Sequence, residues 1–173
     1  MQRSFTFHAL AALAVGALEA QDNPLSAGNK YLYTAIKTNL IKAAQKMPEE
    51  NYSFKPTPDV RSFGQIVGHV ADAQYLFCSA VKGDKQSPDI EKTKTSKADL
   101  VAALQQAFAY CDAVYNAMTD AKAADKLKFF GQDATQLGVL SFNVAHDNEH
   151  YGNIVTYMRL KGLVPPSSES NSP

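Results

Sequence analysis

Residues 135–162, TQLGVLSFNVAHDNEHYGNIVTYMRLKG, give the clearest indication of the fold. Thr135 is a favoured residue at a helix N-cap, and Gly162 is favoured just past a helix C-terminus. No proline interrupts the residues between them, and a proline pair follows soon after. The stretch therefore predicts one long helix that ends at about Lys161.

A polar seam runs along one side of this expected helix. At about 100° per residue, one stripe of the helix holds Val139, Phe142, Asn143, His146, His150, Asn153, Ile154, Tyr157 and Leu160. Burying the polar members without partners costs roughly a few kcal/mol for each group. A metal ion that takes the imidazole lone pairs removes this cost. Asn143, Asn153 or Tyr157 can then hydrogen-bond the second imidazole nitrogens or a bound ligand.

Three histidines are the candidate metal ligands. His146 and His150 are four residues apart, so their side chains lie one above the other on one helix face. Two imidazoles there can hold one ion, and His69 from another helix can complete a three-histidine site with open coordination positions. Four-residue spacing also arises by chance, and His69 alone would be read as a core histidine. The joint pattern favours a metal, because no other histidine remains once residues 1–20 are removed.

The pattern differs from that of a zinc protease. Such enzymes use His-Glu-x-x-His, in which the glutamate beside the first histidine is the general base. Asp147 occupies that place here, while Glu149 points about 60° to the other side of the helix. The third histidine, His69, also precedes the pair in the chain. These departures argue against a protease.

Three further helices are expected upstream. The first spans about residues 26–47 and ends at a proline. The second spans residues 62–82, begins with a capping box of serine and glutamine, and ends at a glycine. His69 lies at the edge of its apolar face. The third spans residues 96–118 and begins with a second box, of serine and aspartate.

The connections indicate how these helices are arranged. Residues 83–95 are polar and charged and are long enough to cross the end of a bundle, so the second and third helices can run parallel. Residues 119–133 are expected to form a loop in which Leu127, Phe129 and Phe130 pack onto the core. No stretch shows the alternation of a strand. The chain is therefore expected to be all-α, a four-helix bundle.

Composition narrows the range of functions. The 173 residues carry 17 basic and 17 acidic side chains, so the formal net charge is zero and nothing supports nucleic-acid binding. Hydrophobic residues make up 45% of the chain, as is usual for a globular protein. No apolar run reaches the roughly 18 residues that a membrane span needs. We expect no nucleic-acid partner and no membrane span.

The first twenty residues have the composition of a signal peptide. Arg3 gives a positive start, residues 5–18 are mostly apolar, and cleavage after Ala20 is expected. The alternative is a first helix of the mature protein. With the signal removed, the domain would span residues 21–166 and the protein would be periplasmic or secreted. The proline- and serine-rich residues 167–173 are expected to form a disordered tail.

Two cysteines would meet an oxidising compartment if the protein is exported. Cys111 falls on the apolar stripe of its helix. Cys78 follows His69 by nine residues, about half a turn out of phase, and is expected to face away from the histidines. This geometry disfavours an intramolecular bridge, and the spacing fits no metal motif.

Two stretches resemble the DinB-like superfamily. One contains Arg61-Ser62-Phe63-Gly64-Gln65-Ile66 and Gly68-His69-Val70-Ala71, and the other contains His146-Asp147-Asn148-Glu149-His150-Tyr151-Gly152-Asn153-Ile154. The similarity covers about residues 25–166. It implies a four-helix bundle of up-down-down-up connectivity. It also implies a divalent metal, commonly nickel or zinc, held by His69, His146 and His150, and frequently a homodimer.

The resemblance leaves the reaction open. Relatives include transferases of low-molecular-weight thiols, a maleylpyruvate isomerase and proteins of no known activity. We expect a metal-dependent enzyme of hydrolase or thiol-transferase type that acts on a small-molecule substrate, with Glu149 and Tyr157 as candidate catalytic groups. Glu149 is equally well read as a solvated helix residue or as a partner of a metal ligand. The alternative function is a non-catalytic periplasmic module that binds a metal or a ligand.

Overall fold

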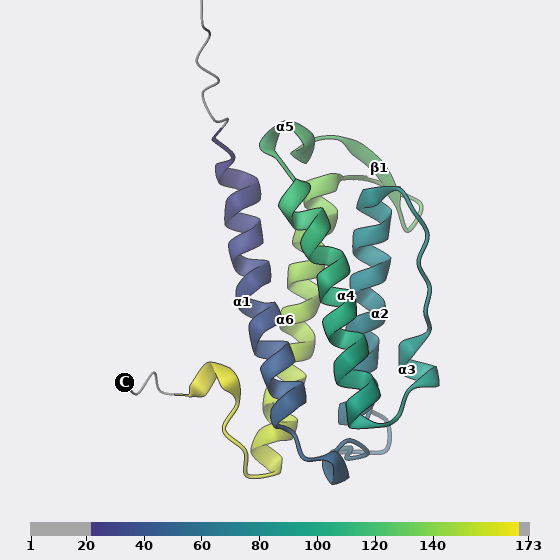
Figure 1. The fold of residues 1–173 in the computed structure, drawn as a ribbon, viewed down its shortest axis with the longest axis vertical. Coiled ribbons are helices and arrows are strands. Elements are labelled where there is room, and N and C mark those ends of the chain that lie inside the picture. Colours follow the sequence, from purple (N-terminus) through teal and green to yellow (C-terminus); the bar gives the residue numbers. More distant parts are fainter. Residues whose placement is uncertain (1–21, 170–173) are drawn as a thin grey trace, which may run out of the picture.

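Four long helices form the body of the computed structural model, which describes residues 22–169 (Figure 1). They are α1 (Pro24–Lys46), α2 (Phe63–Lys82), α4 (Lys97–Ala117) and α6 (Gln136–Leu160). The shorter elements are η1 (Glu49–Asn51), α3 (Ile90–Thr93), α5 (Asp120–Ala123), β1 (Lys126–Phe129), β2 (Gln132–Thr135) and η2 (Pro166–Ser168). The expected signal peptide lies outside the described residues.

The ends of α2 and α6 are set by the caps that the sequence predicts. Ser62 Oγ accepts a hydrogen bond from the Gln65 amide at 3.2 Å, and the Gln65 side chain accepts one from the Ser62 amide at 2.9 Å. Gly83 ends α2 with a φ of 81°, which glycine adopts without strain. Thr135 caps α6 through the Gly138 amide. The predicted bounds of both helices are confirmed to within one residue or two.

Helix α1 begins two residues earlier than predicted, at Pro24. Proline is favoured in the first turn because its missing N–H would have no partner there. The amides of Leu25 and Ser26 donate to the Asp120 carboxylate at 3.0 and 2.8 Å. A side chain of α5 therefore caps α1. No local sequence pattern reveals this cap, because Asp120 lies 94 residues beyond Ser26 in the chain.

The connectivity of the long helices is up-down-down-up. In Figure 1, α1 descends, α2 and α4 both ascend, and α6 descends. The link of residues 83–95 makes the parallel pair possible. It leaves the upper end of α2 and returns along the outside of the bundle to the lower end of α4. The link runs along the outside of the bundle, and the parallel pair that its length was expected to permit is present.

Helix α3, within this link, packs against α2. The Asp72 carboxylate on α2 accepts hydrogen bonds from the amides of Ile90 and Glu91 at 2.7 and 2.9 Å. Gly68 allows the close approach, because a Cβ there would lie 2.7 Å from the Glu91 Cα. The glycine thus lets Glu91 lie beside the histidine that follows it in the sequence.

A two-stranded hairpin joins α5 to α6, so the expectation of no strand was wrong. β1 and β2 pair antiparallel through a turn at Phe130 and Gly131, both with positive φ. Each strand is only four residues long, and β1 does alternate, with Leu127 and Phe129 partly buried and the two lysines exposed, a short signal that the sequence-based prediction missed. Asparagine or aspartate usually marks such a turn, and phenylalanine does not. Phe129 packs against Phe77 as expected, whereas Phe130 is 68% exposed and does not join the core.

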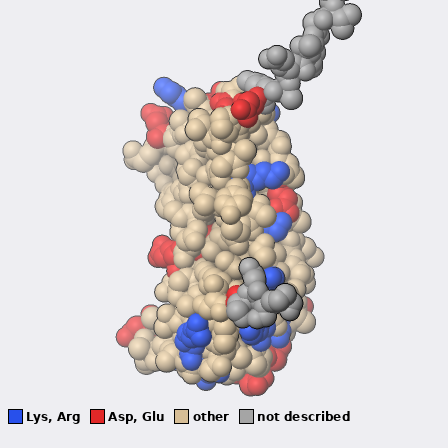
Figure 2. All heavy atoms as spheres, turned by 90° about the vertical axis from the view of Figure 1, so that its left-hand side faces the viewer, with Lys and Arg blue, Asp and Glu red and all other residues tan. Residues whose placement is uncertain are grey.

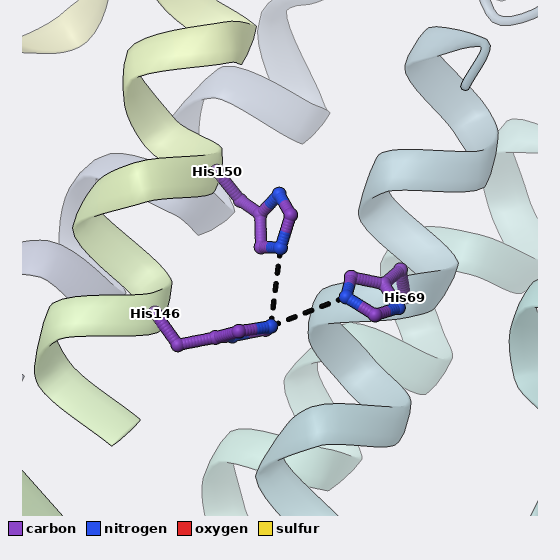
Figure 3. Close-up of side chains that lie close together, drawn as sticks. All are labelled: His69, His146 and His150. Carbon is purple, nitrogen blue, oxygen red and sulfur yellow. Dashed lines mark hydrogen bonds between the residues drawn. The ribbon is translucent and has the colours of Figure 1, made fainter. Parts of the chain in front are cut away.

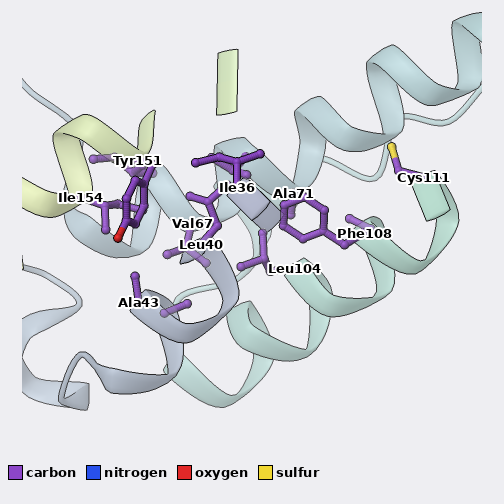
Figure 4. Close-up of a cluster of buried hydrophobic side chains, with 14 of the residues drawn as sticks. Ile36, Leu40, Ala43, Val67, Ala71, Leu104, Phe108, Cys111, Tyr151 and Ile154 are labelled. Carbon is purple, nitrogen blue, oxygen red and sulfur yellow. The ribbon is translucent and has the colours of Figure 1, made fainter. Parts of the chain in front are cut away.

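All four long helices contribute to the core (Figure 4). Its members include Ile36 and Leu40 of α1, Val67 and Ala71 of α2, Leu104 and Phe108 of α4, and Tyr151 and Ile154 of α6. Burying a large side chain of this kind contributes roughly 1.5–3 kcal/mol. A smaller cluster of Ala73, Phe77 and Val139 lies against the hairpin. Because α2 and α6 belong to both clusters, the two helices that carry the histidines are held along much of their length.

Cys78 and Cys111 form a disulfide between α2 and α4. Their Cα atoms are 5.4 Å apart, and both side chains are buried. The expectation that disfavoured this bridge was wrong. Cys78 lies on the side of α2 that packs against α4, and this is where its partner is found. Residue spacing indicates which way a side chain faces, but it does not tell which helix lies there.

The chain after α6 folds back onto the bundle. The Tyr151 hydroxyl accepts a hydrogen bond from the Ser167 amide at 2.9 Å and donates one to the Ser167 hydroxyl at 3.0 Å. Lys46 of α1 pairs with Glu169 at 2.5 Å. Ordered contacts therefore reach residue 169, beyond the expected domain end at 166. The rest of the expected tail lies outside the described residues.

The surface carries charges of both signs. On the face that bears α1, lysine and arginine side chains are interleaved with aspartate and glutamate (Figure 2). Some of them form ion pairs, such as Lys37 with Asp112 at 2.6 Å. Within residues 22–169, no helix combines the length and the hydropathy needed to cross a bilayer.

Candidate metal centre

Three imidazoles converge between α2 and α6 (Figure 3). His69 projects from α2, and His146 and His150 project from successive turns of α6. Nε2 of His146 lies 3.1 Å from Nε2 of His69 and 3.1 Å from Nε2 of His150. The candidate ligand atoms all lie within 4.8 Å of one another. The structure thus brings together the three residues that the sequence singled out.

Two of the three nitrogen separations match those expected for ligands of a shared metal ion. Metal–imidazole bonds are about 2.0–2.1 Å long, so two ligands of one ion lie about 2.9–3.4 Å apart at angles between octahedral and tetrahedral. Both separations of 3.1 Å fall within this range. Three protein ligands would leave at least one coordination position for another ligand. The histidine group can therefore hold a divalent ion.

A carboxylate orients His69. Nδ1 of His69 lies 3.3 Å from Oε2 of Glu91, and Oε1 of Glu91 accepts a hydrogen bond from Nε of Arg61 at 2.8 Å. A proton on Nδ1 faces this carboxylate, which leaves the Nε2 lone pair directed at the other two histidines. The contact with Glu91 favours the tautomer of His69 in which Nε2 is free to bind a metal ion.

Burial keeps all three imidazoles neutral. The pKa of His146 is lowered to about 3, first by burial and then by the neighbouring histidines. The pKa of His150 is lowered to about 4, mainly by burial and by His69. The pKa of His69 is also lowered, by burial and by Arg61, against the raising effect of Glu91. Neutral imidazoles keep the lone pairs that bind a metal.

The other two histidines lack a comparable partner. Nδ1 of His146 and Nδ1 of His150 are buried without a hydrogen-bond partner among the described residues. Packing orients His146 instead, since its ring centroid lies 5.5 Å from that of Phe77. Within residues 22–169, His69 is the one candidate ligand with a carboxylate against its Nδ1.

The polar seam of α6 exists, but its members differ from those expected. Asn143 donates to Gln74 Oε1 at 3.0 Å and to the Tyr115 hydroxyl at 3.2 Å, rather than to an imidazole. Asp147 is buried, and its carboxyl group accepts a hydrogen bond from the side-chain amide of Gln74 at 2.7 Å. Burial raises the pKa of Asp147 far above its usual range. Asn153, expected in the seam, is exposed.

The two candidate catalytic groups lie in different settings. Glu149 is exposed and lines the same hollow as His150. Tyr157 also lines that hollow, but it is buried and its hydroxyl donates to the Arg61 carbonyl at 2.8 Å. Glu149 is therefore the more accessible of the two to a ligand. The catalytic roles of both residues stay predictions.

Two hollows of different character reach the histidines. One has a volume of about 590 Å³ and is lined mainly by polar and charged side chains, among them Lys55, Arg61, Gln65, Glu91, Glu149 and His150. The other has a volume of about 410 Å³ and is lined by Leu76, Phe77, Phe130 and Phe142 together with His69 and His146. Both volumes lie in the range of small-molecule sites. The histidine group is thus accessible to ligands from two directions.

Sequence reasoning did not foresee Glu91, Arg61, Gln74 or the buried state of Asp147. Each acts through a contact with a distant part of the chain, as when Gln74 bonds Asp147 across 73 residues. The available signal was Gly68, because a glycine inside a helix often marks a close approach. It could have located the contact with α3, but not the residue that makes it.

Comparison with known families agrees with this geometry. The family model of the DinB superfamily matches residues 32–154, a stretch that contains all three histidines. The chain belongs to the DinB superfamily. Among curated relatives, it is similar to the uncharacterized protein YjoA of Bacillus subtilis (strain 168), with 25% identity over 122 residues. That alignment covers 69% of this chain and 79% of YjoA.

Solved structures share the DinB-like fold. A DinB-like protein from Bacillus cereus ATCC 10987 superimposes with a TM-score of 0.72 at 20% identity, covering 81% of this chain and 95% of that one. A mutant of the mycothiol-dependent maleylpyruvate isomerase superimposes with a TM-score of 0.64 at 9% identity, covering 75% of this chain and 60% of that one. At these identities the likeness is one of fold.

Proposed function

We propose that the protein is a metal-dependent enzyme in which His69, His146 and His150 hold a divalent ion. The observation that carries the proposal is the convergence of three neutral imidazoles, with two Nε2–Nε2 separations of 3.1 Å, beside hollows large enough for a small molecule. Imidazole ligands suit nickel and zinc, the ions that the family resemblance also implies.

Residues around the site have distinct parts in this proposal. An ion held there would supply Lewis-acid chemistry to a ligand in its open coordination positions. Glu91 keeps the Nε2 lone pair of His69 directed at the site. Glu149 is placed to accept a proton from a substrate bound beside His150, or to return one. Tyr157 acts through the backbone of Arg61, which its hydroxyl holds.

Hydrolysis or group transfer on a small-molecule substrate fits the site best. The two hollows support an enzyme over a non-catalytic binding module, because a structural ion is normally enclosed by four protein ligands. Thiol transfer is the second choice within the enzyme class. It needs a reduced thiol as co-substrate, and an exported protein meets little of it.

We further propose that the protein is periplasmic or secreted. The apolar N-terminal stretch supports export, and so does the buried Cys78–Cys111 disulfide, because disulfides persist in oxidising compartments. N-terminal sequencing of the protein outside the cytoplasm tests this, and an intact Met1 would overturn it. A homodimer is proposed from the family resemblance alone.

Elemental analysis of protein purified without a histidine tag tests the metal centre. We expect one nickel or zinc ion per chain, and loss of that ion when His69, His146 and His150 are all replaced by alanine. Wild-type protein that takes up neither ion during dialysis against nickel or zinc salts would overturn the proposal.

A further inference from the structure

Large exposed hydrophobic side chains gather beside the histidines. Leu76, Phe130 and Phe142 are 42%, 68% and 51% exposed, and all three line the hollow that contains His69 and His146. Single exposed apolar residues are ordinary, but a group of them around one concave surface marks a binding site. Here the group borders the candidate metal centre.

Phe130 is unfavourable for the fold in two respects. Its side chain is left largely in water, and its φ of 49° lies in the left-handed region that phenylalanine rarely adopts. Asparagine, aspartate or glycine is the usual residue at this place in a two-residue hairpin turn. Apart from its ring contact with Phe129, Phe130 gains little packing in return. A residue that breaks local rules in this way indicates a functional position.

The rings around the hollow can hold a flat apolar group. Phe77 is buried, and its ring centroid lies 5.3 Å from that of Phe142 at an interplanar angle of 74°, an edge-to-face contact. The Phe77 centroid also lies 5.5 Å from that of His146. The aromatic lining is therefore continuous with a candidate metal ligand. Aromatic rings in this arrangement accept a further ring edge-on or offset.

We infer that this hollow binds an aromatic ring of the substrate, and that the ring is attached directly to the group that reaches the metal ion. The inference rests on the proposed metal centre and names the substrate class, a small aryl compound with a metal-binding group beside the ring. A volume of about 410 Å³ suits a single substituted ring. The polar part of such a molecule can extend into the hollow lined by Arg61 and Glu149.

Two hydroxamates with the same metal-binding head test the inference. Benzohydroxamate carries a ring, and acetohydroxamate carries a methyl group in its place. Isothermal titration of the full-length, zinc-loaded protein should give at least about tenfold tighter binding for benzohydroxamate. Phe130→Asn should reduce the ratio of the two affinities, benzohydroxamate over acetohydroxamate, about threefold or more. It should not lower the melting temperature, because asparagine suits the turn.

A matched control separates the hollow from exposed apolar surface in general. Leu160→Asn removes another side chain that is 59% exposed, at the C-terminal end of α6, and should leave the ratio unchanged. Equal affinities for the two hydroxamates on zinc-loaded protein would overturn the inference and leave the metal centre standing. A ratio that survives both Phe130→Asn and Phe142→Ala would also overturn it. Failure to take up zinc would overturn the proposed function and this inference together.

Discussion

Proton placement on each imidazole is the residue-level feature on which the metal centre depends. Glu91 lies beside Nδ1 of His69 and favours a proton there, whereas His146 and His150 are positioned by packing and by the turn of α6. A carboxylate behind a metal-binding histidine typically contributes 10–100-fold in affinity, by a rough general estimate. Glu91 is therefore expected to strengthen metal binding although it is not one of the three candidate ligands.

Glu91→Ala should weaken zinc binding by about 10–100-fold, because the His69 ring loses the partner that holds its tautomer and orientation. The zinc affinity of Glu91→Gln should lie between those of Glu91→Ala and the wild type, because the amide oxygen can still accept a hydrogen bond from Nδ1. Competition with a chelator of known affinity measures the change. Glu149→Gln, in the same hollow, is the control and should bind zinc as the wild type does. Equal losses in the Glu91 and Glu149 variants would contradict the role given to Glu91.

His150→Ala should lower zinc affinity by at least about tenfold, because one of three protein ligands is removed. Asn153→Ala is a suitable control, since Asn153 lies on the same helix but is exposed. Both variants should keep the wild-type helix content by circular dichroism. Stoichiometric zinc in His150→Ala after chelator treatment would show that another group is the ligand.

The four long helices and the N-caps of α2, α4 and α6 were predictable from local sequence, whereas the contacts between elements were not. Helix α2 begins at the capping box of Ser62 and Gln65 and ends at Gly83. The hairpin has no comparable sequence signal, because its turn is formed by Phe130 and Gly131. His146 and His150 were found because a fixed helical period brings residues four apart onto one face, and His69 because it is the one other histidine after residue 20. Glu91 was missed because its place beside His69 depends on the path of the whole 83–95 link.

The disulfide joins the two parallel helices α2 and α4 and closes a loop of 33 residues. Replacing Cys78 and Cys111 together by alanine should lower the free energy of unfolding by about 2–4 kcal/mol. Urea denaturation measures this loss. Zinc binding should stay unchanged, because Cys78 faces α4 whereas His69, on the same helix, faces α6. A loss of zinc affinity in the folded double variant would mean that the bridge also positions α2 at the site.

Across the whole molecule, buried polar groups tie three of the long helices together. Gln74 of α2 bonds both Asn143 and Asp147 of α6, and Asn143 also bonds the Tyr115 hydroxyl of α4. Hydrogen bonds between fully buried groups need one relative placement of the helices, because an unmatched partner costs roughly 1–3 kcal/mol. The network therefore fixes the register of α2 against α6, and with it the spacing of His69 from the other two histidines.

The same burial makes the metal-free protein sensitive to acid. The pKa values of His146 and His150 in the folded state are about 3 and about 4, below the ordinary value of 6.5. Between those values the unfolded chain binds protons that the folded chain excludes. The histidine contribution to stability is therefore complete above pH 6.5 and is lost as the pH falls toward the folded-state pKa values.

Metal-free protein should thus lose up to about 1.4 kcal/mol of unfolding free energy per pH unit for each of these histidines as the pH falls from about 6 to 5. Urea titrations at several pH values measure the slope. Asp147, whose pKa burial raises, contributes a slope of the opposite sign, so the comparison must be made with a variant that changes one histidine alone. His146→Asn removes one titrating group and should give a shallower slope. An unchanged slope in that variant would mean that His146 binds protons equally in the folded and unfolded chain, which would contradict the lowered pKa given to this residue.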